Sequence, residues 1–307
     1  MRPVSRLRAV GVSVVVLACG ACDMTRFTAN QTADMFERAA PAFDQHWDYQ
    51  LAGDAAPGSI MQLEGILRAS PENETLLLSL TKAYTGYAFG WVEDELERTD
   101  PMDFEREEYL RHRARLMYLR ARNFAFRIIR LNEDGFDAAR QAGLDAFERW
   151  LAERFDEPED AEILLWAGYS WGSAINVSRD DPEMIADLAF ARALVERSVH
   201  LDESYYQAAG LTFLATMKAS FPEALGGDPE AGRELFERAL TLTHRNRLVV
   251  QVMYARTYAA QTGNRELYEE LLNEVMAAGD VSSDNRLLNK IARRRAQRYL
   301  RNIGEMF

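Results

Sequence analysis

The sequence predicts an all-α fold, a superhelical array of helical hairpins, on three observations. Apolar residues recur at positions i, i+3, i+4 and i+7 along most of the 307-residue chain, as on one face of an α-helix. Glycine and proline gather in short stretches between these segments, and no run alternates apolar and polar residues like a half-buried strand. The helical segments also come in pairs whose order of large and small residues repeats.

The breaks between helical segments carry residues that start helices. Residues 181–183 and 228–230 both read Asp-Pro-Glu, which places an aspartate at the N-cap, a proline at the first helical position and a glutamate in the first turn. A glycine-rich approach to a helix start can bind an anion, but here the aspartate itself occupies the cap. We therefore interpret the second loop as structural, and it comprises Gly226, Gly227, Asp228 and Pro229.

The order of residues within the pairs is that of a degenerate tetratricopeptide unit. In such a unit, small residues lie where two helices approach closely, and large residues fill the space between neighbouring pairs. The clearest copies are Leu164-x2-Ala167-Gly168-x2-Trp171, Ala191-x3-Val195-x2-Ser198 and Gly232-x3-Phe236-x2-Ala239. The unit lengths vary, with long insertions around residues 85–160. A generic helical bundle is the alternative interpretation.

The N-terminus predicts a cleaved lipoprotein signal peptide over residues 1–18. Three arginines precede an apolar stretch at residues 9–17, which is about half of the ~20 residues that a membrane-spanning helix needs. Small residues then precede Cys19 and Cys22, as in a bacterial lipobox, so one of these two cysteines is the predicted lipidation site. An ordinary secretory signal is the alternative.

The choice of cysteine bears on the location of the protein. Gly20 follows Cys19, whereas Asp23 follows Cys22, and an aspartate at that place favours the inner membrane in many Gram-negative bacteria. We expect a periplasmic protein that an N-terminal lipid holds on the inner or the outer membrane. Beyond the signal, we expect a tether at 19–30 and a single helical-repeat domain at 31–307.

Composition argues against several kinds of site. Both cysteines of the chain lie in the signal region, so we expect no disulfide and no cysteine-based metal site. Neither a phosphate-binding P-loop nor a dinucleotide-binding glycine motif is present, and the histidines are dispersed. No metal and no cofactor is therefore expected. The four histidines are His46, His112, His200 and His244.

The chain is acidic, which argues against nucleic acid as a partner. Its formal net charge is −12. Removal of residues 1–18 takes away three arginines and no acid, which leaves 33 basic and 48 acidic residues and a charge near −15. Nucleic acid binding needs a positive surface to meet the phosphates.

One motif suggests an enzyme. Residues 168–172 read Gly-Tyr-Ser-Trp-Gly and match the G-x-S-x-G nucleophile elbow of α/β-hydrolases, in which Ser170 would be the nucleophile. The strand–helix alternation and the glycine-rich oxyanion segment of such enzymes are missing from the sequence. We therefore expect no catalytic residue and interpret Gly168 and Gly172 as helix-packing positions. A serine hydrolase is the least favoured alternative.

Two clusters of aromatic residues are candidates for a ligand site. An array of paired helices curves, and its inner face commonly binds a peptide or a small ligand. The candidate ligand or channel residues are Tyr84, Tyr87, Phe89, Trp91, Trp166, Tyr169 and Trp171. The arginine-rich segment at 293–301 is interpreted as a solvated helix face, with a docking patch for a partner as the alternative.

Several short strings are specific enough to indicate a family. The most specific is ALGGDPE at residues 224–230, followed by FERAL at residues 236–240. Others are LEGIL at residues 63–67, YxxYAF at residues 84–89 and the arginine-rich end of the chain. In these strings, the chain resembles the T-component (TatT) family associated with TRAP transporters, over roughly residues 55–307.

The resemblance implies a periplasmic lipoprotein of degenerate tetratricopeptide-like helix pairs that assembles as a homotrimer. It also implies that the protein docks the periplasmic solute-binding protein (the P-component) of a TRAP transporter and binds or channels a small apolar or organic-acid ligand. The family has no catalytic motif to carry over, so the resemblance implies a protein that is not an enzyme. A general envelope scaffold lipoprotein with other protein partners is the alternative function.

Overall fold

The computed structural model describes the backbone of residues 7–307 and the side chains of residues 24–307. The side chains of Cys19 and Cys22 therefore lie outside the described part, and so does the lipidation that the sequence predicts at one of them. The signal peptide predicted at residues 1–18 also begins outside it.

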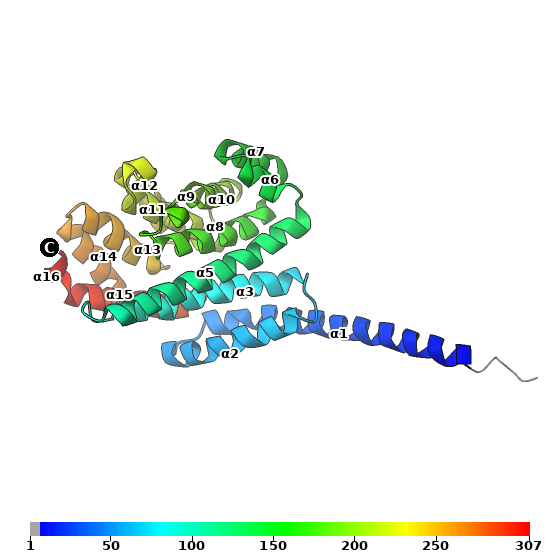
Figure 1. Cartoon of the computed structure of the whole chain (residues 1–307). Coiled ribbons are helices and arrows are strands. Elements are labelled where there is room, and N and C mark those ends of the chain that lie inside the picture. The colour runs from blue at the N-terminus through cyan, green and yellow to red at the C-terminus, as the bar shows by residue number, and fades with distance from the viewer. Residues whose placement is uncertain (1–6) are drawn as a thin grey trace, which may run out of the picture.

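The described chain is all-α, as the sequence predicted, and residues 7–307 contain no strand (Figure 1). Its α-helices are α1 (Leu7–Asp44), α2 (Tyr49–Leu67), α3 (Glu74–Tyr87), α4 (Glu93–Leu96), α5 (Phe104–Asn132), α6 (Phe136–Gln141), α7 (Leu144–Arg154), α8 (Ala161–Asn176), α9 (Pro182–Ala186), α10 (Leu188–Leu201), α11 (Tyr205–Ser220), α12 (Pro229–Leu242), α13 (Val249–Tyr254), α14 (Arg265–Ala277), α15 (Arg286–Arg301) and α16 (Ile303–Met306). Short 3-10 turns lie at η2 (Pro158–Asp160) and η3 (Glu223–Leu225).

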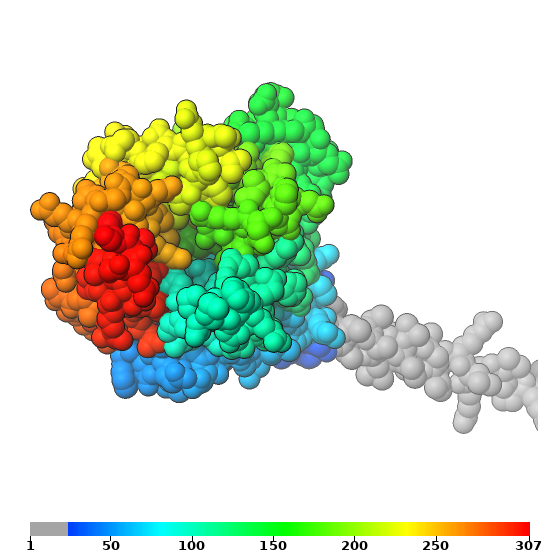
Figure 2. Space-filling view, turned by 60° about the vertical axis from the view of Figure 1, so that its left-hand side comes forward, coloured from blue at the N-terminus to red at the C-terminus, as the bar shows by residue number. Residues whose placement is uncertain are grey.

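Helices that follow each other along the chain pack side by side. α2 packs on α3, α3 on α5, α5 on α8 and α8 on α10, and the series continues through α11, α12, α13 and α14 to α15. Figure 1 shows the resulting curved stack, from which the N-terminal part of α1 projects. The last long helix, α15, also contacts α1 and α2, so the two ends of the array meet. Figure 2 shows this closure, with the red C-terminal segment close to the blue N-terminal helices.

Small residues allow the close helix crossings that the repeat pattern predicted. A Cβ atom added to Gly168 in α8 would lie 2.6 Å from Cγ2 of Val195 and 2.7 Å from the backbone oxygen of Ala191, both in α10. A Cβ atom added to Gly232 in α12 would lie 2.9 Å from the backbone nitrogen of Ala219 in α11. Because backbone atoms cannot move aside, a larger residue at either glycine would push two helices apart.

Polar side chains start many of the helices. The predicted N-caps at Asp181 and Asp228 are both present, since their carboxylates accept hydrogen bonds from the first backbone N–H groups of α9 and α12. Asp48, Asn73 and Asn264 do the same for α2, α3 and α14. Each cap satisfies backbone donors that a helix start would otherwise leave without a partner.

Residues 19–30, for which we expected a tether, belong to helix α1. This stretch has no glycine or proline after Gly20 to interrupt a helix, and it is helical in the structure. Ala29 and Ala33 are buried against the body, and Oδ1 of Asn30 accepts a hydrogen bond from Nδ2 of Asn73 at 2.9 Å. Within the described residues, no helix is both long and apolar enough to cross a bilayer.

The backbone departs from α-helical geometry at two π-helical turns that border one cavity, and at a third place that directly precedes a lining residue, Ala209. Two π-helical turns, η1 (Ala88–Val92) and η4 (Ala255–Ala259), interrupt longer helices. Inside α11, Tyr206, Gln207 and Ala208 have φ values of 46°, 55° and 57°. Residues with side chains adopt such left-handed angles only where the surrounding structure holds them, and π turns and such strained segments are frequent at functional sites.

Candidate functional site

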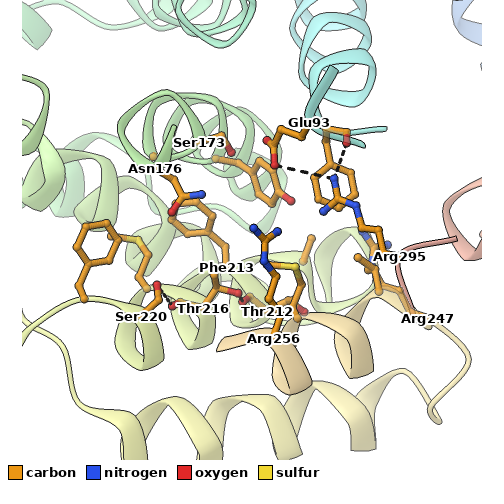
Figure 3. A pocket seen from close by; sticks show the side chains of 18 residues that line it. Glu93, Ser173, Asn176, Thr212, Phe213, Thr216, Ser220, Arg247, Arg256 and Arg295 are labelled. Atoms are coloured by element: carbon orange, nitrogen blue, oxygen red, sulfur yellow. Dashed lines mark hydrogen bonds and ion pairs between the residues drawn. The ribbon is translucent and has the colours of Figure 1, made fainter. Parts of the chain in front are cut away.

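A cavity of about 80 Å³ lies inside the curve of the array, between η1, α8, α11, η4 and α15 (Figure 3). It has room for several water molecules or a small organic group. The apolar part of its wall is made of Phe89, Phe213, Met217, Phe221, Val249 and Met253. The cavity therefore gathers residues that are more than 160 positions apart in the sequence.

One end of the cavity carries small polar side chains. In Figure 3, Ser173, Asn176, Thr216 and Ser220 lie on one side of the cavity, opposite Arg247 and Arg295. The hydroxyls of Thr216 and Ser220 donate to backbone oxygens one turn earlier in α11, at 2.8 and 2.6 Å. Oγ of Ser220 also accepts from Nη2 of Arg179 at 3.1 Å, so the Thr216 hydroxyl is the freer acceptor for a guest. Asn176 is exposed, which places the mouth of the cavity at this end.

The cavity wall also carries three arginines from different parts of the chain. They are Arg247 in the loop before α13, Arg256 in η4 and Arg295 in α15. The side chain of Arg256 is 40% exposed, whereas that of Arg295 is completely buried. Buried arginines at the wall of a cavity need an explanation, because a charge that leaves water without a partner is destabilising.

Arg295 is explained by its partners. Its Nη2 donates to the backbone oxygen of Phe89 at 2.7 Å, and its guanidinium lies 4.0 Å from the centre of the Phe89 ring. It also forms ion pairs with Glu97 at 3.7 Å and Glu93 at 3.9 Å. Arg256 pairs with the same Glu97. Both positive charges are therefore compensated inside the protein.

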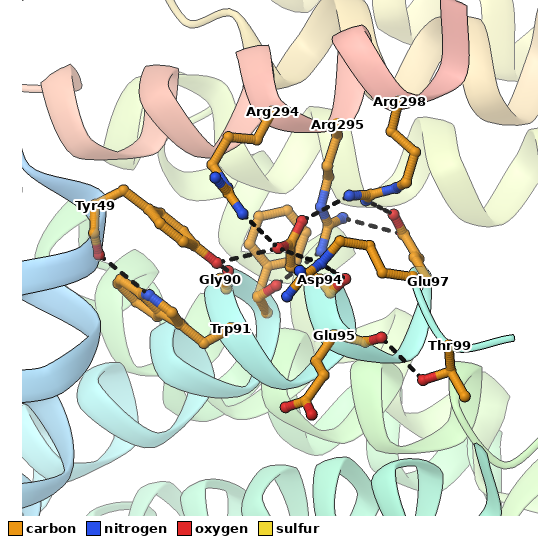
Figure 4. A network of polar contacts seen from close by, with 12 residues as sticks. Tyr49, Gly90, Trp91, Asp94, Glu95, Glu97, Thr99, Arg294, Arg295 and Arg298 are labelled. Carbon is orange, nitrogen blue, oxygen red and sulfur yellow. Dashed lines mark hydrogen bonds and ion pairs between the residues drawn. The ribbon is translucent and has the colours of Figure 1, made fainter. Parts of the chain in front are cut away.

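These pairs belong to a larger network that joins α4 to α15, which we call the α4–α15 clasp (Figure 4). It consists of Asp94, Glu97, Arg294, Arg295 and Arg298. Asp94 is 1% exposed and pairs with Arg298 at 2.8 Å and with Arg294 at 3.3 Å. The clasp holds the N-terminal and C-terminal ends of the array together.

The pKa values of the two carboxylates beside the clasp arginines shift in opposite directions. Burial alone would raise the pKa of Glu97, but the charges of Arg295, Arg256 and Arg298 outweigh it and lower the pKa to about 2. Burial raises the pKa of Glu93, although Arg295 and a hydrogen bond from Tyr118 act against this shift. Glu97 is therefore the firmly ionised partner of the arginines.

Arg247 lacks such compensation. Its side chain is 6% exposed, yet it forms no ion pair within 4.0 Å among the described residues, and its Nε has no hydrogen-bond partner there. Nη1 donates weakly to Oδ1 of Asn285 at 3.4 Å, and the guanidinium lies 4.8 Å from the centre of the Tyr206 ring. Burial lowers the pKa of Arg247, but an arginine stays protonated at physiological pH.

The loop that carries Arg247 is fixed by α15. Asn289 accepts a hydrogen bond from the backbone N–H of Leu248 and donates one to the backbone oxygen of Asn246, both at 2.9 Å. Asn289 is itself buried. Arg247 is thus held between two fastened neighbours, which limits its freedom to turn out toward solvent.

The aromatic candidates divide among several environments. Phe89 and Tyr169 line the cavity, and burial raises the pKa of the Tyr169 hydroxyl to about 12. Trp171 is fully buried against Phe126, with the ring centres 5.1 Å apart, and Trp166 is also in the core. The remaining three candidates lie elsewhere, at contacts between α2 and the α3–α5 region, and they are Tyr84, Tyr87 and Trp91.

Sequence reasoning missed all three cavity arginines as site residues. The interpretation of residues 293–301 as a solvated face is wrong for Arg295, which is completely buried in the clasp, and for Arg298, whose side chain is only 14% exposed there. Arg247 directly precedes the apolar run at residues 248–253, and that position was the one available signal of its burial. Nothing in the local sequence marks Arg256.

The G-x-S-x-G string is part of a helix and not a nucleophile elbow. Residues 168–172 lie in the middle of α8, where Ser170 is fully buried. Its hydroxyl donates to the backbone oxygen of Trp166 at 2.7 Å, as serines inside helices do. A Cβ atom on Gly172 would lie 2.2 Å from the Phe213 ring, so this glycine serves packing.

The glycine loop before α12 has a structural geometry. Gly226 has a φ of +85°, and a Cβ atom on Gly227 would lie 1.7 Å from the backbone oxygen of Phe221. Asp228 caps α12 through the backbone N–H of Ala231 at 3.1 Å. The described residues contain no group of three or more acidic, histidine or cysteine side chains that could hold a metal ion.

Comparison with known proteins identifies relatives of the chain. A family model described as "TRAP transporter T-component" matches residues 45–307, which begin just after α1. A protein of Treponema pallidum (strain Nichols), described as uncharacterized, is 23% identical over 266 residues. The match covers 86% of this chain and 82% of that relative.

Proposed function

Since the chain belongs to the TRAP transporter T-component family, and is thereby a component of such a transporter, we propose that it docks the transporter's periplasmic solute-binding protein and holds a small apolar or organic-acid ligand in its cavity. The family match over residues 45–307 is the observation that carries this proposal. The cavity supports it, because an apolar wall with a few convergent polar groups suits a small organic guest.

We further propose that the protein acts from a membrane surface. The lipobox around Cys19 and Cys22 supports an N-terminal lipid anchor in the periplasm. A tether raises the local concentration of the protein near the membrane components of a transporter, so that a weak partner affinity gives useful occupancy. The mass of the processed N-terminal peptide identifies the lipidated cysteine, and an unmodified peptide would contradict the anchor.

Docking is tested by co-purification from membranes. The tagged full-length protein is expressed at its natural level, and the captured proteins are identified by mass spectrometry. We expect a periplasmic solute-binding protein to be captured with the wild type. A double variant, Cys19→Ala with Cys22→Ala, separates tethering from docking. It should no longer attach to the membrane but should still bind the partner in a soluble extract. If no such binding protein is captured with either form, the docking proposal fails.

A general envelope scaffold is the second candidate. The exposed apolar side chains of Phe104, Tyr109 and Leu116 on α5 support protein–protein contact without specifying a transporter. The same capture experiment decides, because envelope-assembly proteins in place of a solute-binding protein would favour the scaffold. Genes for a TRAP binding protein and permease beside this gene would favour the transporter.

The oligomeric state is also a proposal. The resemblance that the sequence shows to the family implies a homotrimer. The mass of the detergent-solubilised protein by light scattering tests it, with three chains as the expected result and one chain as the contrary one.

A further inference from the structure

We infer that the cavity binds a monoanion with an apolar tail, and that Arg247 recognises its carboxylate. This inference rests on the proposed function for the role of the ligand, but its argument uses only the cavity. It begins with the state of Arg247, which is a buried charge without an ionic partner among the described residues.

A buried guanidinium with free N–H donors favours the binding of an anion. A guanidinium has five N–H donors, and that of Arg247 meets two partners, Oδ1 of Asn285 in a long bond at 3.4 Å and the hydroxyl of Tyr206. The carboxylate of Asp44 acts on it only from beyond 4.0 Å, and the other groups that influence it electrostatically are the hydroxyls of Tyr206 and Tyr169. Arg247 is at the same time part of the cavity wall, so a guest in the cavity can reach the unused donors.

The charges around the cavity set the charge of the guest. Arg295 and Arg256 share Glu97, and Arg295 also meets Glu93, so two positive charges face two acidic groups. Arg247 adds one positive charge that, among the described residues, no carboxylate within 4.0 Å balances, and the more distant Asp44 offsets it only in part. A guest with one negative charge would neutralise the site, whereas a second negative charge would bring Glu93 and Glu97 into repulsion with it.

The shape of the cavity sets the orientation of the guest. Arg247 and Arg295 are buried at one end, whereas Asn176 is exposed at the other (Figure 3). Between these ends, Phe213 and Met217 of α11 supply apolar surface. A carboxylate would therefore enter first and meet Arg247, and an alkyl or aryl tail would lie along α11 toward the mouth.

The strained backbone of α11 supports a built site. Tyr206 keeps its ring 4.8 Å from the Arg247 guanidinium while its φ is 46°. A ring face stabilises a cation and leaves the edge of the guanidinium free to bind a planar carboxylate with two parallel hydrogen bonds. The strained backbone thus places the Tyr206 ring where it holds Arg247 in a defined orientation.

The test compares three six-carbon probes by calorimetry. The mature lipoprotein is placed in lipid nanodiscs, and empty nanodiscs correct for partition into lipid. Hexanoate carries one charge, hexan-1-ol none and adipate two. We expect hexanoate to bind at least about tenfold more tightly than either of the others, since a charge-assisted hydrogen bond to a buried arginine is worth about that factor.

Two variants with the same loss of charge locate the effect. Arg247→Met should weaken hexanoate binding at least about tenfold and leave hexan-1-ol unchanged. Arg238→Met removes an exposed arginine of α12 that pairs with Glu203 outside the cavity, and it should change neither. The inference is overturned if hexanoate fails to bind the wild type, if it binds no better than hexan-1-ol or adipate, or if Arg247→Met binds it normally.

Failure of this inference is distinguishable from failure of the proposed function. Capture of the solute-binding protein is measured with the same Arg247→Met variant. If the solute-binding protein is still captured while the wild type does not bind hexanoate, the docking proposal is supported and the monoanion site is contradicted.

Discussion

The α4–α15 clasp and the Arg247 site each contain a buried arginine, but only the arginine of the clasp has carboxylate partners. In the clasp, Arg295 is completely buried and meets Glu97 and Glu93. At the cavity end, Arg247 is nearly as buried and meets no carboxylate within 4.0 Å in the described chain. The burial of an arginine therefore says little about its role until its partners are counted.

The difference separates stabilisation from binding. A buried pair that loses one member leaves an uncompensated charge, so the clasp arginines hold the ends of the array together. An arginine without a partner already carries that penalty in the folded state, and its removal should help the fold. The two arginines should therefore respond to the same substitution with opposite signs.

The largest effect is expected for Arg295→Met. The substitution leaves Glu97 with fewer positive neighbours and Glu93 buried without its ion pair. We expect the free energy of unfolding to fall by about 3–5 kcal/mol, measured by urea denaturation followed by circular dichroism. A loss below about 1 kcal/mol would show that the clasp does not hold the array together.

The pH dependence of stability should report Glu97. Its pKa is about 2 in the folded protein and near the usual 4.5 in the unfolded chain, so the unfolded state binds the proton more tightly. The resulting contribution of about 3 kcal/mol is present above pH 4.5 and is lost as the pH falls toward 2. Urea denaturation of wild type and Glu97→Gln between pH 3 and 6 checks this.

At pH 6, Glu97→Gln should be the less stable protein, and the difference between the two should stay constant down to about pH 4.5 and shrink below it. Glu93 is retained in both proteins, but the charge of Glu97 helps to raise its pKa, so part of the difference reports Glu93. A difference that stays constant over this range would mean that Glu97 is not the titrating group.

A smaller effect of opposite sign is expected for Arg247→Met. Removal of a buried charge without an ionic partner should raise the free energy of unfolding by about 1 kcal/mol in the absence of ligand, even though the contacts to Asn285 and Tyr206 are lost. Urea denaturation measures it. A loss of several kcal/mol would place Arg247 with the clasp arginines and remove the contrast between the two regions.

The smallest effect is expected for Arg238→Met. Arg238 and Glu203 form an ion pair on the surface, where the arginine side chain is 58% exposed. Such pairs contribute less than about 1 kcal/mol, so the unfolding midpoint should barely move. A shift as large as that of Arg295→Met would indicate that loss of any arginine destabilises this acidic protein through its overall charge.

The sequence predicted the fold because this fold depends on patterns that repeat over short stretches of the chain. Apolar spacing located the helices, and small residues such as Gly168 marked a close crossing, where an added Cβ atom would lie 2.7 Å from the Ala191 backbone oxygen. Aspartates before proline marked helix starts at Asp181 and Asp228. Each of these signals depends on residues within one or two turns of each other.

The site was only partly predictable because it depends on residues far apart in the sequence. Phe89 and Tyr169 were named as candidates and line the cavity, but the arginines were not. The surroundings of Arg295 are set by Glu93 and Glu97, about 200 positions earlier, and no local pattern reveals that meeting. The lack of an ionic partner at Arg247 is still harder to predict from the sequence, since it depends on every residue that surrounds the side chain in the folded protein.

The two π-helical turns have a consequence for how such a cavity changes by insertion and deletion. A π turn holds one residue more than the α-helical turn it replaces, and each residue rotates a helix by about 100°. η1 contributes Phe89 to the cavity and η4 contributes Arg256. Deletion of one codon in either turn would restore a regular helix and turn a different side chain inward. The selectivity of the cavity can therefore be altered by a change in length, without any substitution among the residues that line it.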